Sequence, residues 1–136
     1  MKKYGLIKSN PKEYSFDNLL NDKKILWTKI SSIISSKKVN SLNIGDELFF
    51  YHTGNENKIV GIVEVISDVK QNPDYNDPKF SAFEIQPIKK LKRPIELWEI
   101  KSHPELKQSD LVQVPELDFL FLDENHWNLI INLSEK

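Results

Sequence analysis

The spacing of apolar residues divides the 136-residue chain into strand-like and helix-like segments. A short apolar run at 4–8 predicts a first strand. Ser15 can cap a helix after it, because Phe16 and Leu19 then lie on one face. The segment 25–39 is ambiguous, since its apolar residues have helical spacing while its four serines disfavour a helix.

From residue 44 onward the alternation becomes that of strands. We expect strands over 47–53 and 58–66, joined by a hairpin connection at 54–57. The second of these is apolar on both faces, which indicates a central strand. A further strand is predicted over 80–90, and Pro87 near its end indicates a position at the sheet edge.

The rest of the chain predicts short helices around one more strand. Helical turns are expected over 94–107, a strand over 117–122, and a C-terminal helix capped by Asp123. The proline- and asparagine-containing loop 71–79 is long for a domain of this size and is therefore a candidate functional loop. The element order predicts the α+β class, with a small, curved antiparallel sheet and flanking short helices.

Composition narrows the range of functions. Hydrophobic residues make up 39% and charged residues 29%, as expected for one globular domain over 1–136. The absence of cysteine excludes disulfide frameworks, thiolate metal sites and a cysteine nucleophile. No apolar run approaches the ~18 residues of a membrane span, and the first residues lack the apolar stretch of a signal peptide. We therefore expect a cytoplasmic protein with no membrane partner.

Residues that could carry catalysis are sparse. The three histidines lack metal-binding spacing and the four glycines form no phosphate-binding motif, so we expect neither a metal nor a cofactor. No pair of carboxylates and no nucleophile elbow is evident, and we expect no enzymatic activity. His52, at the end of a predicted strand, is either a hydrogen-bonded structural histidine or a donor or acceptor in a pocket, and the sequence favours neither.

Two groups of residues suit nucleic-acid binding. Trp27 is either a core residue or a wall on which an unpaired base stacks, an interaction of about 1–3 kcal/mol per base. Tyr75 and Phe80 flank the long loop and can close over the same ligand. The net charge of −1 requires a binder to gather its basic residues on one face. The basic pairs that could line such a track are Lys2-Lys3, Lys23-Lys24, Lys37-Lys38 and Lys89-Lys90, the last followed by Lys92 and Arg93.

An ordered set of short motifs resembles the EVE domain family. Residues 4–15, YGLIKSNPKEYS, are similar to the family's opening K-S-E-P-x-x-Y-S. Residues 50–53, FYHT, resemble its F-Y-H-S, and residues 59–65, IVGIVEV, resemble its I-V-G-I-A-E-V. Trp27 stands where the family has the tryptophan of W-D-G-V, and Trp127 matches the last helix. The resemblance covers nearly the whole chain.

The EVE domain is similar to YTH domains, the readers of N6-methyladenosine, and both belong to the PUA-like superfamily. The resemblance implies a PUA-like β-barrel with flanking helices and a pocket for a modified base flipped from its strand, in DNA or RNA. Trp27 would form one wall of that pocket, and a residue near Phe80 would form a second. The expected ligand-binding residues are Lys8, Ser9, Asn10, Trp27, Thr28, His52 and Phe80, and the expected backbone contacts are Lys37, Lys38, Lys89, Lys90 and Arg93.

The chain also departs from the family's pattern. Where the family usually reads R-N-Y-Q-A-R-N after its tryptophan motif, residues 31–37 are SSIISSK, and the family's glutamate in K-S-E-P is Asn10. The polar wall of the pocket is therefore rewritten. The expected function is non-catalytic reading of a modified base, with an effector protein recruited in trans. The alternative is a small hydrolase similar to the ASCH family that acts on modified nucleosides through Lys8 and Glu64.

Overall fold

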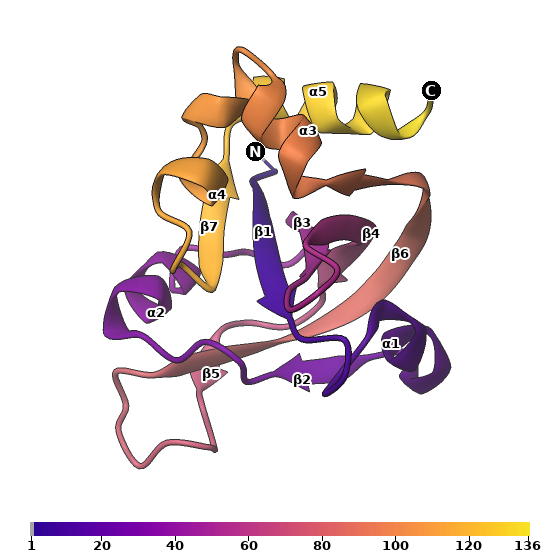
Figure 1. Cartoon of the computed structure of the whole chain (residues 1–136). Coiled ribbons are helices and arrows are strands. Elements are labelled where there is room, and N and C mark those ends of the chain that lie inside the picture. Colours follow the sequence, from indigo (N-terminus) through magenta and orange to yellow (C-terminus); the bar gives the residue numbers. More distant parts are fainter. Residues whose placement is uncertain (1) are drawn as a thin grey trace.

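A curled sheet of seven strands forms the centre of the computed structural model, which describes residues 2–136 (Figure 1). Six strands follow the order β2-β6-β4-β3-β1-β7, and β5 pairs with β6 beside this path. The expected α+β class with a curved sheet is confirmed, although β1 and β3 run parallel within the otherwise antiparallel sheet. The strands are β1 (Tyr4–Ser9), β2 (Ile25–Trp27), β3 (Glu47–His52), β4 (Lys58–Val65), β5 (Lys70–Gln71), β6 (Ser81–Glu96) and β7 (Phe119–Leu122).

Helices cover both faces of the sheet, and each face has its own apolar core. On one face Phe16 and Leu19 of α1 pack with Phe50, and on the other Trp127 of α5 stacks on Phe49 with ring centroids 3.9 Å apart. Within residues 2–136, no helix combines the length and the apolar character that a membrane crossing requires. The helices are α1 (Phe16–Asp22) and α2 (Ile33–Val39) on the first face, and α3 (Leu97–Ser102), the 3-10 turn η1 (Leu106–Gln108), α4 (Asp110–Gln113) and α5 (Glu124–Ser134) on the second.

Helix starts are set by the capping residues that the sequence indicated. The Ser15 hydroxyl accepts a hydrogen bond from the backbone N–H of Asn18, and the Asn18 side chain accepts one from the N–H of Ser15. This reciprocal pair satisfies two N–H groups that a helix leaves unpaired. Asp123 caps α5 in the same way, by accepting from the N–H of His126 at 2.7 Å.

The ambiguous segment 25–39 contains both a strand and a helix. Trp27 ends β2, and α2 begins only after Ser32, which accepts a hydrogen bond from the N–H of Ser35. The helical spacing of the apolar residues was misleading, because part of it belongs to a strand. As a result α2 buries Ser35 and Ser36, whereas Ile34 is 65% exposed.

Strand β6 is longer and more central than the strand predicted over 80–90. It lies between β2 and β4 and continues through Pro94, so the helical turns expected from residue 94 begin only with α3. The edge position indicated by Pro87 is therefore wrong for the strand as a whole. Pro87 is tolerated because it lies beyond the β2 pairing, which ends at Ile85, and opposite Val63 of β4, where the pairing of β4 with β6 shifts register.

A close contact between α1 and β4 occurs at Gly61. The pairing of β4 with β6 shifts register around this residue, and the ring of Phe16 lies directly against its backbone. A Cβ at position 61 would lie 2.4 Å from Cζ of Phe16, which is shorter than any real carbon–carbon contact. Only glycine therefore allows α1 to approach β4 this closely.

We expect Gly61→Ala to lower the free energy of unfolding by about 1–3 kcal/mol, because the added methyl displaces the buried Phe16 ring. Urea denaturation measures the loss. Phe16→Leu provides room for the methyl, so the double variant should lose less than the sum of the two single losses. Strictly additive losses would contradict the direct contact.

Candidate functional site

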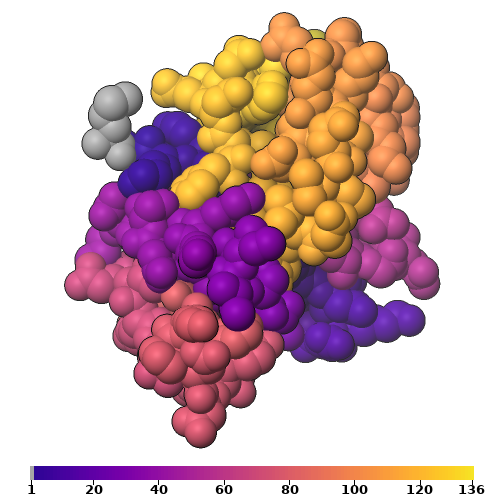
Figure 2. All heavy atoms as spheres, turned by 90° about the vertical axis from the view of Figure 1, so that its left-hand side faces the viewer, coloured from indigo at the N-terminus to yellow at the C-terminus, as the bar shows by residue number. Residues whose placement is uncertain are grey.

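Three loops meet near the C-terminal end of β1, and we call them the three-loop cluster: residues 10–15, 28–32 and 114–118. They connect β1 to α1, β2 to α2, and α4 to β7 (Figure 1). In the space-filling view the orange residues before β7 lie against the purple residues around α2 (Figure 2). The cluster thus joins segments that are far apart in the sequence.

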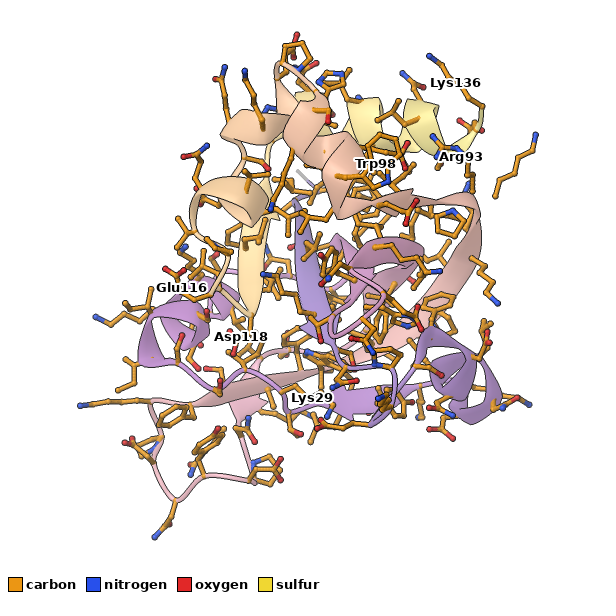
Figure 3. All side chains as sticks on the ribbon, viewed as in Figure 1. Lys29, Arg93, Trp98, Glu116, Asp118 and Lys136 are labelled. Atoms are coloured by element: carbon orange, nitrogen blue, oxygen red, sulfur yellow. The ribbon has the colours of Figure 1, made fainter. Side chains whose placement is uncertain are left out.

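Polar contacts tie the three loops to one another. Ser31 donates to Oδ2 of Asp118 twice, from its backbone N–H at 2.7 Å and from its hydroxyl at 2.9 Å. The Lys29 ammonium lies 3.5 Å from a carboxylate oxygen of Glu13, so loop 10–15 is linked to loop 28–32 (Figure 3). Sequence reasoning missed these four residues, because 87 positions separate Ser31 from Asp118 and no spacing signals such a pair.

Lys8 connects β1 to the third loop. Its Nζ donates to the carbonyl oxygen of Pro115 at 2.7 Å and lies 5.8 Å from the ring centroid of Tyr51. Burial lowers the pKa of Lys8, and the negative charges of Asp118 and Glu116 partly oppose this effect. Lys8 is therefore a partly desolvated cation at the rim of the cluster.

The structure does not bring Lys8 and Glu64 together. Lys8 is aligned with Tyr51 at the end of β3, whereas Glu64 is aligned with Glu47 at its start. Glu64 instead accepts a hydrogen bond from Gln86 at 2.8 Å. The prediction that Lys8 and Glu64 form the lysine–acid pair of a hydrolase is therefore wrong.

Trp27 lies at the start of loop 28–32 and is buried, with 1% of its surface exposed. Its ring packs edge-on against Phe50, with centroids 5.4 Å apart, and is covered by Tyr14 at 6.3 Å. Its indole N–H is buried and has no hydrogen-bond partner among residues 2–136, and the same holds for Oδ1 of Asp118. Buried polar groups are normally paired, so two unpaired ones near the same loops require an explanation.

The other small polar residues expected at the site hold loops in place. The Ser9 hydroxyl donates to the carbonyl oxygen of Tyr14 at 2.6 Å, and the Asn10 side chain accepts from the N–H of Lys12 at 3.0 Å. The carbonyl oxygen of Thr28 accepts from the side-chain amide of Asn72 at 2.9 Å. The hydrogen bonds of Ser9, Asn10 and Thr28 thus fix the conformation of the loops in the cluster.

Phe80 belongs to the segment 72–80, which protrudes from the body of the molecule (Figure 2). Its ring stacks on that of Tyr75, with centroids 4.1 Å apart and planes inclined by 10°. Within the described part of the chain, neither ring is paired with Trp27. The two aromatic residues therefore meet each other, and the link from this segment to the cluster runs through Asn72.

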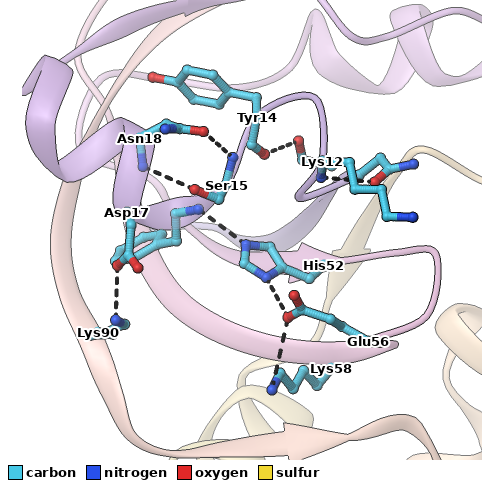
Figure 4. A network of polar contacts seen from close by, with 12 residues as sticks. Lys12, Tyr14, Ser15, Asp17, Asn18, His52, Glu56, Lys58 and Lys90 are labelled. Carbon is cyan, nitrogen blue, oxygen red and sulfur yellow. Dashed lines mark hydrogen bonds and ion pairs between the residues drawn. The ribbon is translucent and has the colours of Figure 1, made fainter.

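His52 uses both ring nitrogens within the fold (Figure 4). Nε2 lies 3.0 Å from the backbone nitrogen of Phe16, and Nδ1 lies 2.9 Å from Oε1 of Glu56. Because a backbone N–H is always a donor, Nε2 accepts and Nδ1 carries the proton that it donates to Glu56. His52 thus caps the first turn of α1 while its ring borders an open hollow of about 500 Å³.

The basic residues expected to contact phosphates do not form one track. Lys37 and Lys38 lie on α2, whereas Lys89, Lys90 and Arg93 lie on the curved part of β6 at the opposite side of the molecule (Figure 1). Lys90 is 2.8 Å from Asp17, and Arg93 is 2.9 Å from Glu99. No group of three acidic or histidine side chains in residues 2–136 is placed to hold a metal ion.

Comparison with known proteins gives matches along the whole chain. The sequence model of the EVE domain matches residues 3–133. Thymocyte nuclear protein 1 of Mus musculus is 25% identical, over 97% of this chain and 74% of the mouse protein.

Two solved structures have related folds. Human THYN1 protein, solved in complex with DNA containing 5-methylcytosine, has a TM-score of 0.93 at 22% identity, with 99% of both chains covered. The YTH domain of the Zygosaccharomyces rouxii MRB1 protein, solved with N6-methyladenosine RNA, has a TM-score of 0.60 at 16% identity, over 98% of this chain and 87% of that domain.

His52→Ala should lower the free energy of unfolding by about 1–3 kcal/mol, because it leaves the buried N–H of Phe16 without an acceptor. Glu56→Gln keeps an acceptor for Nδ1–H and should change stability by less than about 0.5 kcal/mol. Urea denaturation of both variants tests the assigned proton. A neutral His52→Ala would rule out the capping role.

Burial raises the pKa of Tyr51 to about 12. The unfolded chain ionises this phenol near pH 10, so the stabilisation is present below pH 10 and is lost as the pH rises from about 10 to 12. We expect Tyr51→Phe to lose less stability over this interval than the unmodified chain. Unfolding free energies measured at pH 9, 10 and 11 compare the two, and identical slopes would contradict the burial.

Proposed function

Because the chain belongs to the EVE domain family, we propose that it is a non-catalytic reader that binds a modified base of DNA or RNA at the three-loop cluster. The observation that carries this proposal is the buried, unpartnered indole N–H of Trp27. A base flipped from its strand supplies a hydrogen-bond acceptor on its edge and a flat face for stacking. That human THYN1 and a yeast YTH domain were solved with modified bases in DNA and RNA supports the proposal.

The unpartnered groups require a base edge that carries one acceptor and one donor. The Trp27 N–H is a donor, and Oδ1 of Asp118 is an acceptor. Cytosine and adenine carry a ring-nitrogen acceptor next to an amino donor on their pairing edge, whereas thymine and uracil carry a ring N–H donor between two carbonyl oxygens. Either kind of edge can pair an acceptor with the Trp27 N–H and a donor with Oδ1 of Asp118, and we favour a modified cytosine or adenine because human THYN1 was solved with 5-methylcytosine DNA and a YTH domain with N6-methyladenosine RNA.

Access to Trp27 requires loop 10–15 to move, because Tyr14 covers the indole. The Tyr14 hydroxyl donates to Asp22 at 2.8 Å, and this bond must break when the ring swings away. The ion pair between Glu13 and Lys29 also spans the entrance. The Glu13 carboxylate is 69% exposed, so breaking this pair costs at most about 1 kcal/mol. The cost of opening the entrance above Trp27 is therefore compatible with the free energy that stacking of a base contributes.

In this proposal Lys37 and Lys38 contact the phosphates near the cluster, because α2 directly follows loop 28–32. Lys89, Lys90 and Arg93 lie away from it. As a binding module, the protein would act through an effector protein in trans.

The test uses labelled single strands that carry cytosine, 5-methylcytosine, adenine or N6-methyladenine at the centre, with fluorescence anisotropy as the measurement. Trp27→Phe keeps a ring but removes the N–H, and Asp118→Asn places an amide donor where the unpartnered acceptor lies. Each should weaken binding of the preferred modified strand by about 5- to 100-fold, which corresponds to 1–3 kcal/mol. Trp27→Ala is less informative, because removing a buried tryptophan costs about 3–5 kcal/mol of stability.

Ser35→Ala is the matched control, because its hydroxyl is also buried and unpartnered but lies on α2 outside the three-loop cluster. It should leave binding unchanged. Equal affinity for all four strands, or affinity unaffected by both pocket variants, would overturn the reader proposal. Turnover of modified nucleosides incubated with the protein would instead support the hydrolase alternative, with Lys8 beside Asp118 and Glu116 as its reactive amine.

A further inference from the structure

Trp98 differs from the other two tryptophans of the chain in its exposure. It is 63% exposed on α3, whereas Trp27 and Trp127 are 1% and 5% exposed. Its indole N–H donates to Oε2 of Glu96 at 3.1 Å, and Glu96 in turn caps α3. A large aromatic ring is thus held at the surface in a defined position, so little conformational entropy is lost when a ligand stacks on it.

The surroundings of Trp98 are basic. Arg93 lies on the preceding strand, and its guanidinium bonds both to Glu99 of α3 and to the carbonyl oxygen of Leu133 (Figure 3). Lys92 and Lys101 are exposed and form no ion pair within residues 2–136, whereas Glu99 is neutralised by Arg93. The carboxylate of Glu96, which accepts from the indole N–H, has no cation partner within residues 2–136, so the two lysines leave only a small excess of positive charge for a phosphate backbone.

A concave path leads from the three-loop cluster to this ring. Three hollows of the surface share Glu56 in their walls. The first is bordered by Asn10 of the cluster and has a volume of about 420 Å³, the second is bordered by His52, and the third by Trp98 and Lys101. The charge of Glu56 is offset by Lys58 at 3.8 Å, and its carboxylate accepts a hydrogen bond from Nδ1 of His52 at 2.9 Å.

We propose that this path carries the single-stranded segment next to the modified base, and that the Trp98 indole stacks on one base of that segment while Lys92 and Lys101 contact its phosphates. This inference rests on the proposed reader function for the position of the modified base. Stacking on an indole accepts any base, so Trp98 adds affinity for the flanking strand without adding sequence preference. The protein would then recognise a modified base within a longer single strand better than the free nucleoside.

The test compares Trp98→Leu with Trp98→Phe on strands of two lengths. Leucine keeps an apolar side chain but cannot stack, whereas phenylalanine keeps an aromatic face. For a twelve-nucleotide strand with a central modified base, Trp98→Leu should weaken binding by about 5- to 100-fold and Trp98→Phe by much less. The modified nucleoside alone should bind both variants like the unmodified protein. Lys101→Gln should make the affinity for the long strand less dependent on salt concentration, by the amount that corresponds to the loss of about one phosphate contact.

Fluorescence gives a second readout. Because Trp98 is the exposed tryptophan, iodide should quench its emission, and a bound long strand should protect it from iodide. Circular dichroism and urea denaturation of the Trp98 variants serve as the folding control, and we expect native spectra because position 98 is exposed.

The outcomes separate this inference from the reader proposal. If modified and unmodified strands bind equally but Trp98→Leu weakens both, the path is supported and the reader function fails. If Asp118→Asn abolishes the preference for the modified strand but Trp98→Leu binds the long strand normally, the reader function stands and the path is overturned. Equal losses in Trp98→Leu and Trp98→Phe would also overturn it, because stacking would not explain them.

Discussion

The contact between the Phe16 ring and the bare backbone of Gly61 is the constraint on which the rest of the structure depends. This contact allows α1 to lie against β4 where the pairing of β4 with β6 shifts register. The backbone N–H of Phe16 also donates a hydrogen bond to His52 of β3. Loop 10–15 continues directly from β1 at its near end, and its far end is held by the bond from the Ser9 hydroxyl to the carbonyl oxygen of Tyr14 and by the bond from the Phe16 N–H to His52. The entrance to the three-loop cluster has its shape because both ends of this loop are fixed.

Features that depend on neighbouring residues could be predicted from the sequence. The strands around 4–9, 47–52 and 58–65 follow from apolar alternation, and the helix starts follow from Ser15 and Asp123, whose side chains act on the next turn. The split of 25–39 into strand and helix could not be predicted, because β2 exists only through its pairing with β6, more than fifty positions away. Local propensity carries no information about such a partner.

The candidate site shows the same division between local and long-range information. The resemblance pointed to the end of β1 and to Trp27, whereas the structure shows that Ser9 and His52 use their hydrogen-bonding groups to hold α1 and its loop. Within residues 2–136, the buried side-chain atoms without a partner include the indole nitrogen of Trp27 and Oδ1 of Asp118, beside the Ser35 hydroxyl on α2. Asp118 belongs to a stretch without a distinctive motif, and its role depends on where β7 returns beside β1. Short motifs thus indicate a candidate region, whereas tertiary contacts decide which of its polar groups are already paired.

The parallel pairing of β1 with β3 has a consequence for how the molecule assembles. The chain between these strands must form α1, β2 and α2, and β2 is completed only when residues 83–85 of β6 are available. Loop 114–118, which closes the cluster through Asp118, comes later still. On a ribosome that makes the chain from its N-terminus, the three-loop cluster is therefore among the last parts to form. A nascent chain that ends before residue 118 carries most of the sheet but not yet the completed three-loop cluster.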